Sequence, residues 1–390
     1  MAGQLIQKGE RTWLIRVYMG RDGNGKPQYP GVTFHGRKKE AESHLHRLLV
    51  ERDSGTYRKP TKMSLGAYLD QWLAAKSWKS ERTKDDYTAL LSRYVRPALG
   101  SRRLDQLSPL DIQALYESMK ARGLSGRTLA YTHTVLSSAL KQARRWRPIA
   151  VNPAEDVERP SKDARHDDDE HEDMRVLSLE EAERFLAAAE GDRWGVLFKF
   201  ALATGMRPGE YRALKWSDVA PDFTHVRVQR AISEPKRGWK IDRTKTKQSR
   251  RTIPLPPETA LALAEHRRRQ AEVRLAHGPG YADLDLVFAN RDGRPLNENN
   301  LVNRHFKHVL RAARLDPKLR LYDLRHTCAT MLLADGENVK TVSERLGHAS
   351  IVLTLQTYAH VLPTMQQGAA DRLQRILFGG RHTAEPTGTL

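Results

Sequence analysis

The chain has 390 residues, 39% of them hydrophobic, which suits two to four domains at roughly 100–200 residues each. It contains no run of about 20 apolar residues that could cross a membrane and no apolar signal segment. The single cysteine, Cys328, excludes an internal disulfide and a cysteine-based metal site. The 66 Lys and Arg residues against 47 Asp and Glu residues give a net charge of +19, which favours a nucleic acid as partner over a membrane surface. We therefore expect a cytoplasmic protein that binds nucleic acid.

Residues 1–56 are predicted to form a three-stranded sheet followed by a helix. Apolar and polar side chains alternate in Thr12–Met19, as in a strand with one buried face. The Asp-Gly-Asn-Gly sequence at 22–25 is a turn signal, and Tyr29–Phe34 can return as the next strand. Because basic residues outnumber acidic ones here, a sheet that lies in a DNA groove is favoured over a solvated accessory module.

Residues 62–160 are predicted to be helical throughout, after a linker that contains Pro60. Ser64 can cap the first helix, and apolar residues recur at helical spacing along the segment. Such stripes are typical of a packed core rather than of a chemical site. The Lys and Arg residues on the polar faces agree in sign with the whole chain, and we expect some of them to contact phosphates.

Residues 161–174 are polar and charged without periodicity, which is typical of a linker. The His and acidic residues there could bind a metal, but no apolar framework would hold them, so a flexible tether is favoured. Residues 175–378 form the largest predicted domain, which is mainly helical with a β-hairpin between Thr224–Ile232 and Lys240–Leu255. Residues 379–390 are predicted to be a disordered tail.

Four segments of the largest domain carry the candidate chemistry. Each contains Arg, Lys, His or Tyr residues in a short motif, and Tyr358 follows His348 by ten residues. The segments are Thr204–Glu210, Thr244–Leu255, Tyr322–Thr327 and Leu346–His348, with Thr357–His360 after the fourth.

In this order and spacing the four segments resemble the tyrosine recombinases, also called the phage integrase family. The resemblance covers residues 175–378 in detail and the preceding helical domain in outline. The sheet of residues 1–56 resembles the arm-type DNA-binding domain of many phage and transposon integrases. The resemblance implies a multidomain, mainly α protein with small β-sheets: an arm-binding sheet with a helix, a helical core-binding domain and a mixed α/β catalytic domain.

The resemblance also implies a role for each matched residue. The matched positions comprise a nucleophile, two catalytic arginines, a hairpin lysine, a late histidine and a supporting acidic residue. In that order they are Tyr358, Arg207 and Arg325, Lys245, His348 and Glu210. Asp323 could support the site in a similar way.

One position departs from the family. Tyr322 stands three residues before Arg325, where the family most often has histidine. A phenol, with an ordinary pKa of about 10, is a poor base at neutral pH. Tyr322 could instead donate a hydrogen bond to the phosphate or orient Tyr358, whose proton would pass to water or leave through electrostatic stabilisation of the phenolate. His326, next to Arg325, is interpreted as a packing or hydrogen-bonding residue.

These residue types suit the cleavage of a phosphodiester without a metal or another cofactor. Two guanidiniums can bind the non-bridging oxygens, on which negative charge builds up. A tyrosine forms a covalent phosphotyrosine that conserves the bond for rejoining, so ATP is not required. Lys245 could protonate the leaving deoxyribose oxygen, with Lys247 as the alternative. The cluster of Asp and Glu expected of a two-metal nuclease is missing from the sequence.

We therefore expect a site-specific recombinase that cuts and rejoins duplex DNA through a 3′-phosphotyrosine, for integration or excision of a phage or mobile element. The family acts as four protomers on two DNA sites, and proteins that bend DNA or set direction would be accessory partners. Residues 364–377 form a candidate amphipathic helix that docks either on a neighbouring protomer or in cis.

Two alternatives remain at this point. A type IB topoisomerase would use the same residues to relax DNA, but the arm-like sheet and the candidate docking helix argue against it. A non-catalytic DNA-binding regulator would not need the complete set of Arg, Lys, His and Tyr. Strand exchange between two sites separates the first alternative from a recombinase, and a covalent protein–DNA adduct separates the second.

Overall fold

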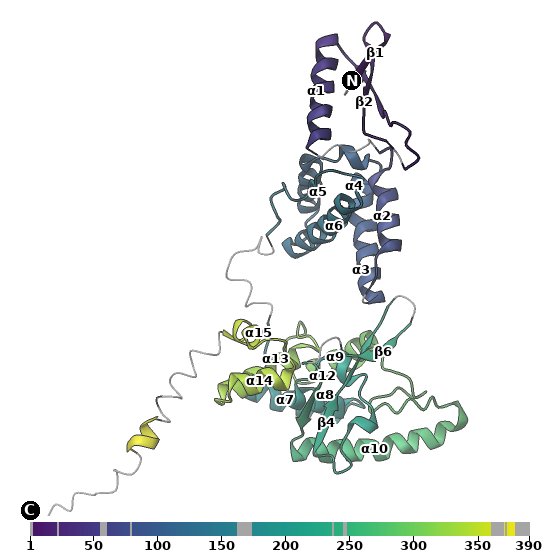
Figure 1. The fold of residues 1–390 in the computed structure, drawn as a ribbon. Coiled ribbons are helices and arrows are strands. Elements are labelled where there is room, and N and C mark those ends of the chain that lie inside the picture. The colour runs from purple at the N-terminus through teal and green to yellow at the C-terminus, as the bar shows by residue number, and fades with distance from the viewer. Residues whose placement is uncertain are drawn as a thin grey trace, which may run out of the picture. The chain divides into compact units, whose positions relative to one another are not determined.

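The chain divides into two compact units, Met1–Asp167 and Asp168–Leu390 (Figure 1). Both are built mainly from helices with short antiparallel sheets, which confirms the predicted fold class. In the part of the chain that the structure describes, no helix is long and apolar enough to span a membrane. The computed structural model describes residues 3–21, 23–54, 61–78, 80–161, 174–235, 238–244, 248–359, 370 and 373–378.

The first unit begins with a three-stranded antiparallel sheet in which β2 lies between β1 and β3. Trp13, Ile15 and Val17 of β2 are buried, and helix α1 packs against them. Strand β2 ends at Val17, two residues before the predicted end. The alternation of side chains is weak in β1, GQLIQKG, so periodicity alone gave no sign of this strand. The elements are β1 (Gly3–Gly9), β2 (Thr12–Val17), β3 (Gly31–His35) and α1 (Lys38–Asp53).

A helical bundle follows in the same unit. Helices α2, α5 and α6 begin where a serine side chain, that of Ser64, Ser108 and Ser125 respectively, accepts a hydrogen bond from a backbone N–H group. The core of the bundle contains Trp72 and Leu136, both nearly fully buried. The elements are α2 (Leu65–Ala75), α3 (Glu81–Leu90), the π-helix Leu91–Val95, α4 (Arg96–Leu99), the 3-10 helix Leu104–Gln106, α5 (Pro109–Ala121) and α6 (Gly126–Trp146).

The second unit contains the four segments with the candidate chemistry. It consists of helices and two short strand pairs. The helices are α7 (Leu179–Glu190), α8 (Gly195–Thr204), α9 (Pro208–Tyr211), α10 (Pro257–His277), α11 (Glu298–Leu301), α12 (Lys307–Ala312), α13 (Asp323–Ala334), α14 (Val339–Leu346) and α15 (Ile351–Thr357). Short turns of 3-10 or π-helix lie at Trp216–Asp218, Gly278–Gly280 and Val302–Phe306. The strands are β4 (His225–Val228), β5 (Arg230–Ser233), β6 (Lys240–Arg243) and β7 (Arg251–Pro254).

The predicted single hairpin is wrong in one respect, because its strands form two separate ladders. Strand β4 pairs with β7, and β5 pairs with β6, both antiparallel. Gln229 alone separates β4 from β5, whereas the seven residues 244–250 separate β6 from β7. The amide of Thr244, the first of these seven residues, still donates to the carbonyl of Gln229 at 3.1 Å. This mismatch in length explains the break, since one residue cannot pair with seven.

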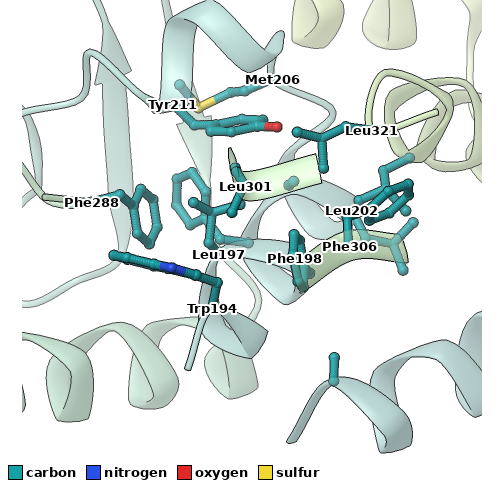
Figure 2. Packing of buried hydrophobic residues seen from close by; sticks show 14 of the residues in the cluster. Trp194, Leu197, Phe198, Leu202, Met206, Tyr211, Phe288, Leu301, Phe306 and Leu321 are labelled. Atoms are coloured by element: carbon teal, nitrogen blue, oxygen red, sulfur yellow. The ribbon is translucent and has the colours of Figure 1, made fainter. Parts of the chain in front are cut away.

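Helix α8 lies at the centre of the second unit's core. It contacts α7, α10 and α13, and Leu197, Phe198 and Phe200 have no exposed surface. Phe198 packs against Phe306 with ring centroids 5.6 Å apart (Figure 2). Phe200 packs against Phe288 with ring centroids 5.5 Å apart. Burial of this many aromatic rings fixes α8 firmly, because each contributes roughly 1.5–3 kcal/mol. The site begins at the C-terminal end of this helix.

That end depends on a glycine. Gly205 caps α8 with φ of +63°, in the left-handed region that favours glycine. A Cβ atom at this position would lie 3.0 Å from Leu346 Cδ2 and 3.3 Å from the sulfur of Cys328. Cys328 is itself buried on α13, with Sγ 3.9 Å from the carbonyl oxygen of Ala203. Helices α8, α13 and α14 therefore meet closely at Gly205.

Candidate active site

Arg207 is placed by the turn that starts α9. It is the N-cap residue, Pro208 occupies the first turn, and the Arg207 amide donates to Glu210 Oε2 at 3.0 Å. The guanidinium donates from Nη1 to Glu210 Oε1 at 2.9 Å and from Nη2 to the carbonyl of Gly347 at 3.3 Å. Arg207 thus connects α9 to the loop after α14.

Glu210 is a buried carboxylate shared by two arginines. Arg251, the first residue of β7, donates from Nη2 to Glu210 Oε2 at 2.9 Å and from Nη1 to Oε1 at 3.2 Å. Burial alone would raise the pKa of Glu210, but the hydrogen bond and charge of Arg251, and then Arg207, lower it below its ordinary value. The predicted supporting residue is therefore ionised and holds both arginines in place.

Arg325, the third residue of α13, is buried, with 1% of its surface exposed. Its Nη1 donates to the carbonyl of Gly205 at 2.8 Å. Its Nη2 is buried and has no hydrogen-bond partner among the described residues. Burial, and next the charge of Arg207, lower the pKa of Arg325 to about 10, so the guanidinium stays protonated at neutral pH.

His348 follows Gly347, which ends α14 in the left-handed conformation. Its ring nitrogen Nδ1 lies 2.7 Å from the hydroxyl of Thr354, which is fully buried. Burial, followed by the charges of Arg325 and Arg207, lowers the pKa of His348 to about 3. The imidazole is therefore neutral at physiological pH and carries a single N–H.

Tyr358 ends α15 and is buried, with 1% of its surface exposed. It packs against Leu333 of α13 and Leu346 of α14. Its hydroxyl lies 3.0 Å from Nδ1 of His326, and this is its hydrogen bond in the described part of the chain. Burial raises the pKa of Tyr358 well above its ordinary value, although the nearby charge of Arg325 opposes this.

Asp323 and Tyr322 lie at the start of α13. Asp323 is fully buried and accepts hydrogen bonds from the amide of Arg320 at 2.7 Å and from its Nη2 at 3.0 Å. It therefore supports the beginning of the helix. Tyr322 is 38% exposed, and its ring centroid lies 5.2 Å from that of His326.

The chain is similar to known proteins along most of its length. The model of the phage integrase family matches residues 175–365. A protein described as tyrosine recombinase XerC-like from Caldanaerobacter subterraneus subsp. tengcongensis is 29% identical over 95% of this chain and 98% of its own. An integrase of Streptomyces ambofaciens is 30% identical over 92% of this chain and 92% of its own.

The chain belongs to the phage integrase family, the tyrosine recombinases. It is accordingly a site-specific recombinase, an enzyme that cuts and rejoins DNA, as the motifs predicted. The fold of this recombinase matches that of the Tn1549 transposon integrase, solved in complex with a circular intermediate DNA. The TM-score is 0.65 at 21% identity, over 80% of this chain and 100% of the other. Lambda integrase, solved as a tetramer bound to a Holliday junction, matches with a TM-score of 0.55 at 17% identity, over 89% and 95% of the two chains.

The structure of the recombinase brings most of the predicted site residues together. Arg207 and Arg325 are both close enough to lower the pKa of His348 and to act on Tyr358. Lys245, and its alternative Lys247, lie outside the described residues, between β6 and β7. Within the described ranges, no group of three or more His, Cys, Asp and Glu side chains could hold a metal ion.

Motif reasoning missed one residue of the site and undervalued another. Arg251 was not singled out, although it shares a strand face with the buried Ile253, two residues later, which is a period-2 signal. His326 was interpreted as a packing or hydrogen-bonding residue, and its partner proves to be the candidate nucleophile. No sequence signal identifies that partner, because Tyr358 lies 32 residues away along the chain.

Proposed function

We propose that the recombinase attacks a phosphodiester of duplex DNA with the hydroxyl of Tyr358 and forms a 3′-phosphotyrosine. The rejoining strand then displaces the tyrosine. The observation that supports this assignment is the convergence of four elements. The turn before α9, helix α13, the loop after α14 and the end of α15 bring their site residues together, so that the charges of Arg207 and Arg325 act on both His348 and Tyr358.

Three side chains would donate hydrogen bonds to the phosphate. Nη2 of Arg325 is buried without a hydrogen-bond partner among the described residues. Such an unsatisfied donor reduces stability by about 1–3 kcal/mol unless a ligand oxygen accepts its hydrogen bond. Arg207 keeps further N–H groups beyond those bound to Glu210 and Gly347. Neutral His348 would donate from Nε2 while Thr354 donates to Nδ1. Such donors contribute roughly 3–4 kcal/mol each to the transition state.

We assign the general acid to Lys245, in the segment that joins β6 to β7. Lys247 remains the alternative. The leaving 5′-oxygen needs a proton, and the long connection of residues 244–250 beside a one-residue partner gives this segment the length to reach a scissile phosphate. Two other residues of the site are less suited to be the general acid. Arg251 is already bound to Glu210, and His348, as a neutral ring, has little acidity.

The proposed assembly is a tetramer on two duplex sites. The solved lambda integrase, which has a similar fold, is a tetramer bound to a Holliday junction. In this scheme residues 1–56 bind arm sites, residues 62–160 bind the core site, 161–174 is the linker, and 175–378 catalyse the reaction. Exposed apolar side chains at the end of the chain support contact between protomers: Ile351, Val352, Leu353 and Leu355 on α15, and Leu373, Ile376, Leu377 and Phe378 beyond it. We further propose that the enzyme integrates or excises a mobile element in the cytoplasm. Accessory proteins that bend DNA would assist it.

The nucleophile is tested with Tyr358→Phe. The variant should bind a nicked duplex from the junctions of the encoding element as tightly as the wild type, because only a hydroxyl is lost. It should form no covalent adduct, whereas the wild type is trapped when the nick releases a short strand. Tyr281→Phe, a phenol remote from these motifs on the chain, is the matched control and should form the adduct normally. An adduct with Tyr358→Phe on a denaturing gel would exclude Tyr358 as nucleophile.

A further inference from the structure

The ring of His326 lies between two tyrosines. Its Nδ1 is 3.0 Å from the hydroxyl of Tyr358, within hydrogen-bond distance. The ring centroids of His326 and Tyr358 are 5.8 Å apart, and those of His326 and Tyr322 are 5.2 Å apart, both at tilts near 60°. Packing on both sides restricts the rotation of the imidazole and keeps Nδ1 directed at the hydroxyl.

The proton of Tyr358 needs an acceptor. Burial raises the pKa of this phenol, so only a minute fraction is phenolate at neutral pH. Tyr322, at the position where related enzymes most often have histidine, is itself a phenol. A base must lie within about 2.6–3.2 Å of the proton donor, directly or through one water. In the described part of the chain, His326 meets this requirement.

The second imidazole of the site is not suited to this task. Nδ1 of His348 is bound to the hydroxyl of Thr354 at 2.7 Å. Its pKa is lowered to about 3 by burial and then by Arg325 and Arg207, which makes it a very weak base. His348 is thus arranged as a donor, which leaves the proton of Tyr358 to His326.

We propose that His326 is the general base that activates Tyr358, a proposal that rests on Tyr358 being the nucleophile. In cleavage, the proton of the Tyr358 hydroxyl passes to His326 Nδ1 as the tyrosine oxygen bonds to phosphorus. The bond from phosphorus to the 5′-oxygen breaks, and that oxygen takes a proton from the general acid. In rejoining, the attacking 5′-hydroxyl returns its proton to the general acid, and His326 returns its proton to the tyrosine oxygen. Tyr322 acts as a positioning residue, because its ring packs on the base.

The proposal predicts a specific effect of pH on cleavage. Among the residues that the structure describes, the titratable or charged groups near His326 include Tyr322 and Arg325 on its own helix, Tyr358 at the end of α15, and His348 before α15. Arg325 has a pKa of about 10, His348 has one of about 3, and that of Tyr358 is raised. None of these three titrates between about pH 5 and 8, where a histidine ordinarily does.

The experiment measures single-turnover adduct formation by the full-length protein on a nicked duplex between about pH 5 and 8. Wild-type cleavage should slow as the pH falls and His326 becomes protonated. His326→Asn keeps a hydrogen-bond acceptor near the place of Nδ1 but is not basic. It should cleave about 100-fold more slowly at neutral pH, the typical effect of a general base, and lose the wild-type pH dependence. DNA affinity should not change.

Controls separate the base from the nucleophile and from the fold. His308→Asn changes an exposed histidine of the same unit and should retain the wild-type rate and pH profile. His326→Gln gives a second chance of a folded variant, and thermal unfolding verifies both. Wild-type rates in His326→Asn, or a loss of rate that is equal at every pH, would overturn the proposal for His326 alone. An adduct with Tyr358→Phe would instead overturn the assignment of the nucleophile.

Discussion

At the scale of single residues, the three arginines of the site differ in how many of their donors the protein uses. Arg251 gives Nη1 and Nη2 to Glu210, Nη1 also to the carbonyl of Ser249, and Nε to the carbonyl of Arg345. Arg325 gives Nη1 to one carbonyl and leaves Nη2 without a described partner. We infer that Arg251 shapes the site, whereas Arg325 has a donor to spare for a ligand.

The neutral state of His348 predicts how stability depends on pH. In the unfolded chain a histidine binds a proton near its ordinary pKa of about 6.5, but folded His348 does so only at about 3. Below pH 6.5 the unfolded state therefore binds more protons than the native state. The contribution of His348 to the free energy of unfolding is complete above about pH 6.5 and is lost as the pH falls toward 3.

Hydrogen exchange of the α13 and α14 amides measures this effect in the full-length protein. Between pH 6.5 and pH 5 the wild type should lose about 1–2 kcal/mol more protection than His348→Gln, which cannot bind a proton. Exchange rates are compared after correction for the intrinsic effect of pH. Equal losses in the two proteins would show that His348 is protonated at similar pH in both states.

Single residues also show how far the sequence can predict the site. Arg207, Arg325, His348 and Tyr358 each belong to a short motif with a fixed spacing, so the motifs were sufficient to propose them. The hydrogen bond between Tyr358 and His326 was not predictable, because it depends on how α15 packs on α13. Motifs indicate which residues are present, and tertiary packing decides which of them touch.

At the scale of elements, two consecutive residues of α13 form hydrogen bonds with two different helix ends. Neighbouring positions on a helix point about 100° apart. Arg325 consequently reaches the carbonyl of Gly205 at the end of α8, while His326 reaches Tyr358 at the end of α15. Asp323 and its hydrogen bonds with Arg320 fix the start of this helix. A small rotation of α13 would therefore disturb the arginine and the histidine together.

The pair of broken ladders was predicted in part. Alternating residues near Thr224–Ile232 and Lys240–Leu255 correctly indicated strands joined through a turn. The separation into β4–β7 and β5–β6 was not predicted, because periodicity says which residues are extended but not which residues pair. The seven residues 244–250 opposite Gln229 become visible only once the register is known.

The connection between β6 and β7 gives a prediction for Lys245. As a general acid it would control departure of the leaving group, whereas a phosphate-binding lysine controls affinity and its salt dependence. Lys245→Ala should cleave roughly 10²–10⁴-fold more slowly and bind DNA almost as well as the wild type. A substrate with a 5′-bridging sulfur has a leaving group that needs no proton, and it should restore cleavage.

Lys247→Ala is the matched control for this experiment. It should lose less activity and gain little from the sulfur substrate. Rescue of Lys247→Ala without rescue of Lys245→Ala would transfer the role to Lys247. If sulfur rescues neither variant, the general acid lies elsewhere in the enzyme.

At the scale of the whole molecule, each part has a core of its own. Trp13, Ile15 and Val17 of the sheet pack with α1, whereas the bundle that follows is centred on Trp72 and Leu136. A third cluster around α8 fills the second unit. Because no cluster of the first unit includes described residues of the second, the loss of one part should not unfold the others.

Removal of residues 1–56 should therefore spare cleavage at a core site and abolish binding to separate arm sites. The basic sheet is expected to provide the arm contacts, and the proposed catalytic residues all lie beyond residue 200. Footprints of the full-length and truncated proteins on DNA with both kinds of site provide the measurement. Identical footprints would refute the arm-binding role of the sheet.

Cys328 has a practical consequence for studies of movement on DNA. It is the only thiol of the chain, it is buried beside Gly205, and burial raises its pKa, so little reactive thiolate forms. The native sequence can thus serve as an unlabelled background for fluorescent dyes attached through maleimides. One cysteine introduced on each unit would then report the distance between the units by energy transfer, before and after a DNA duplex is added.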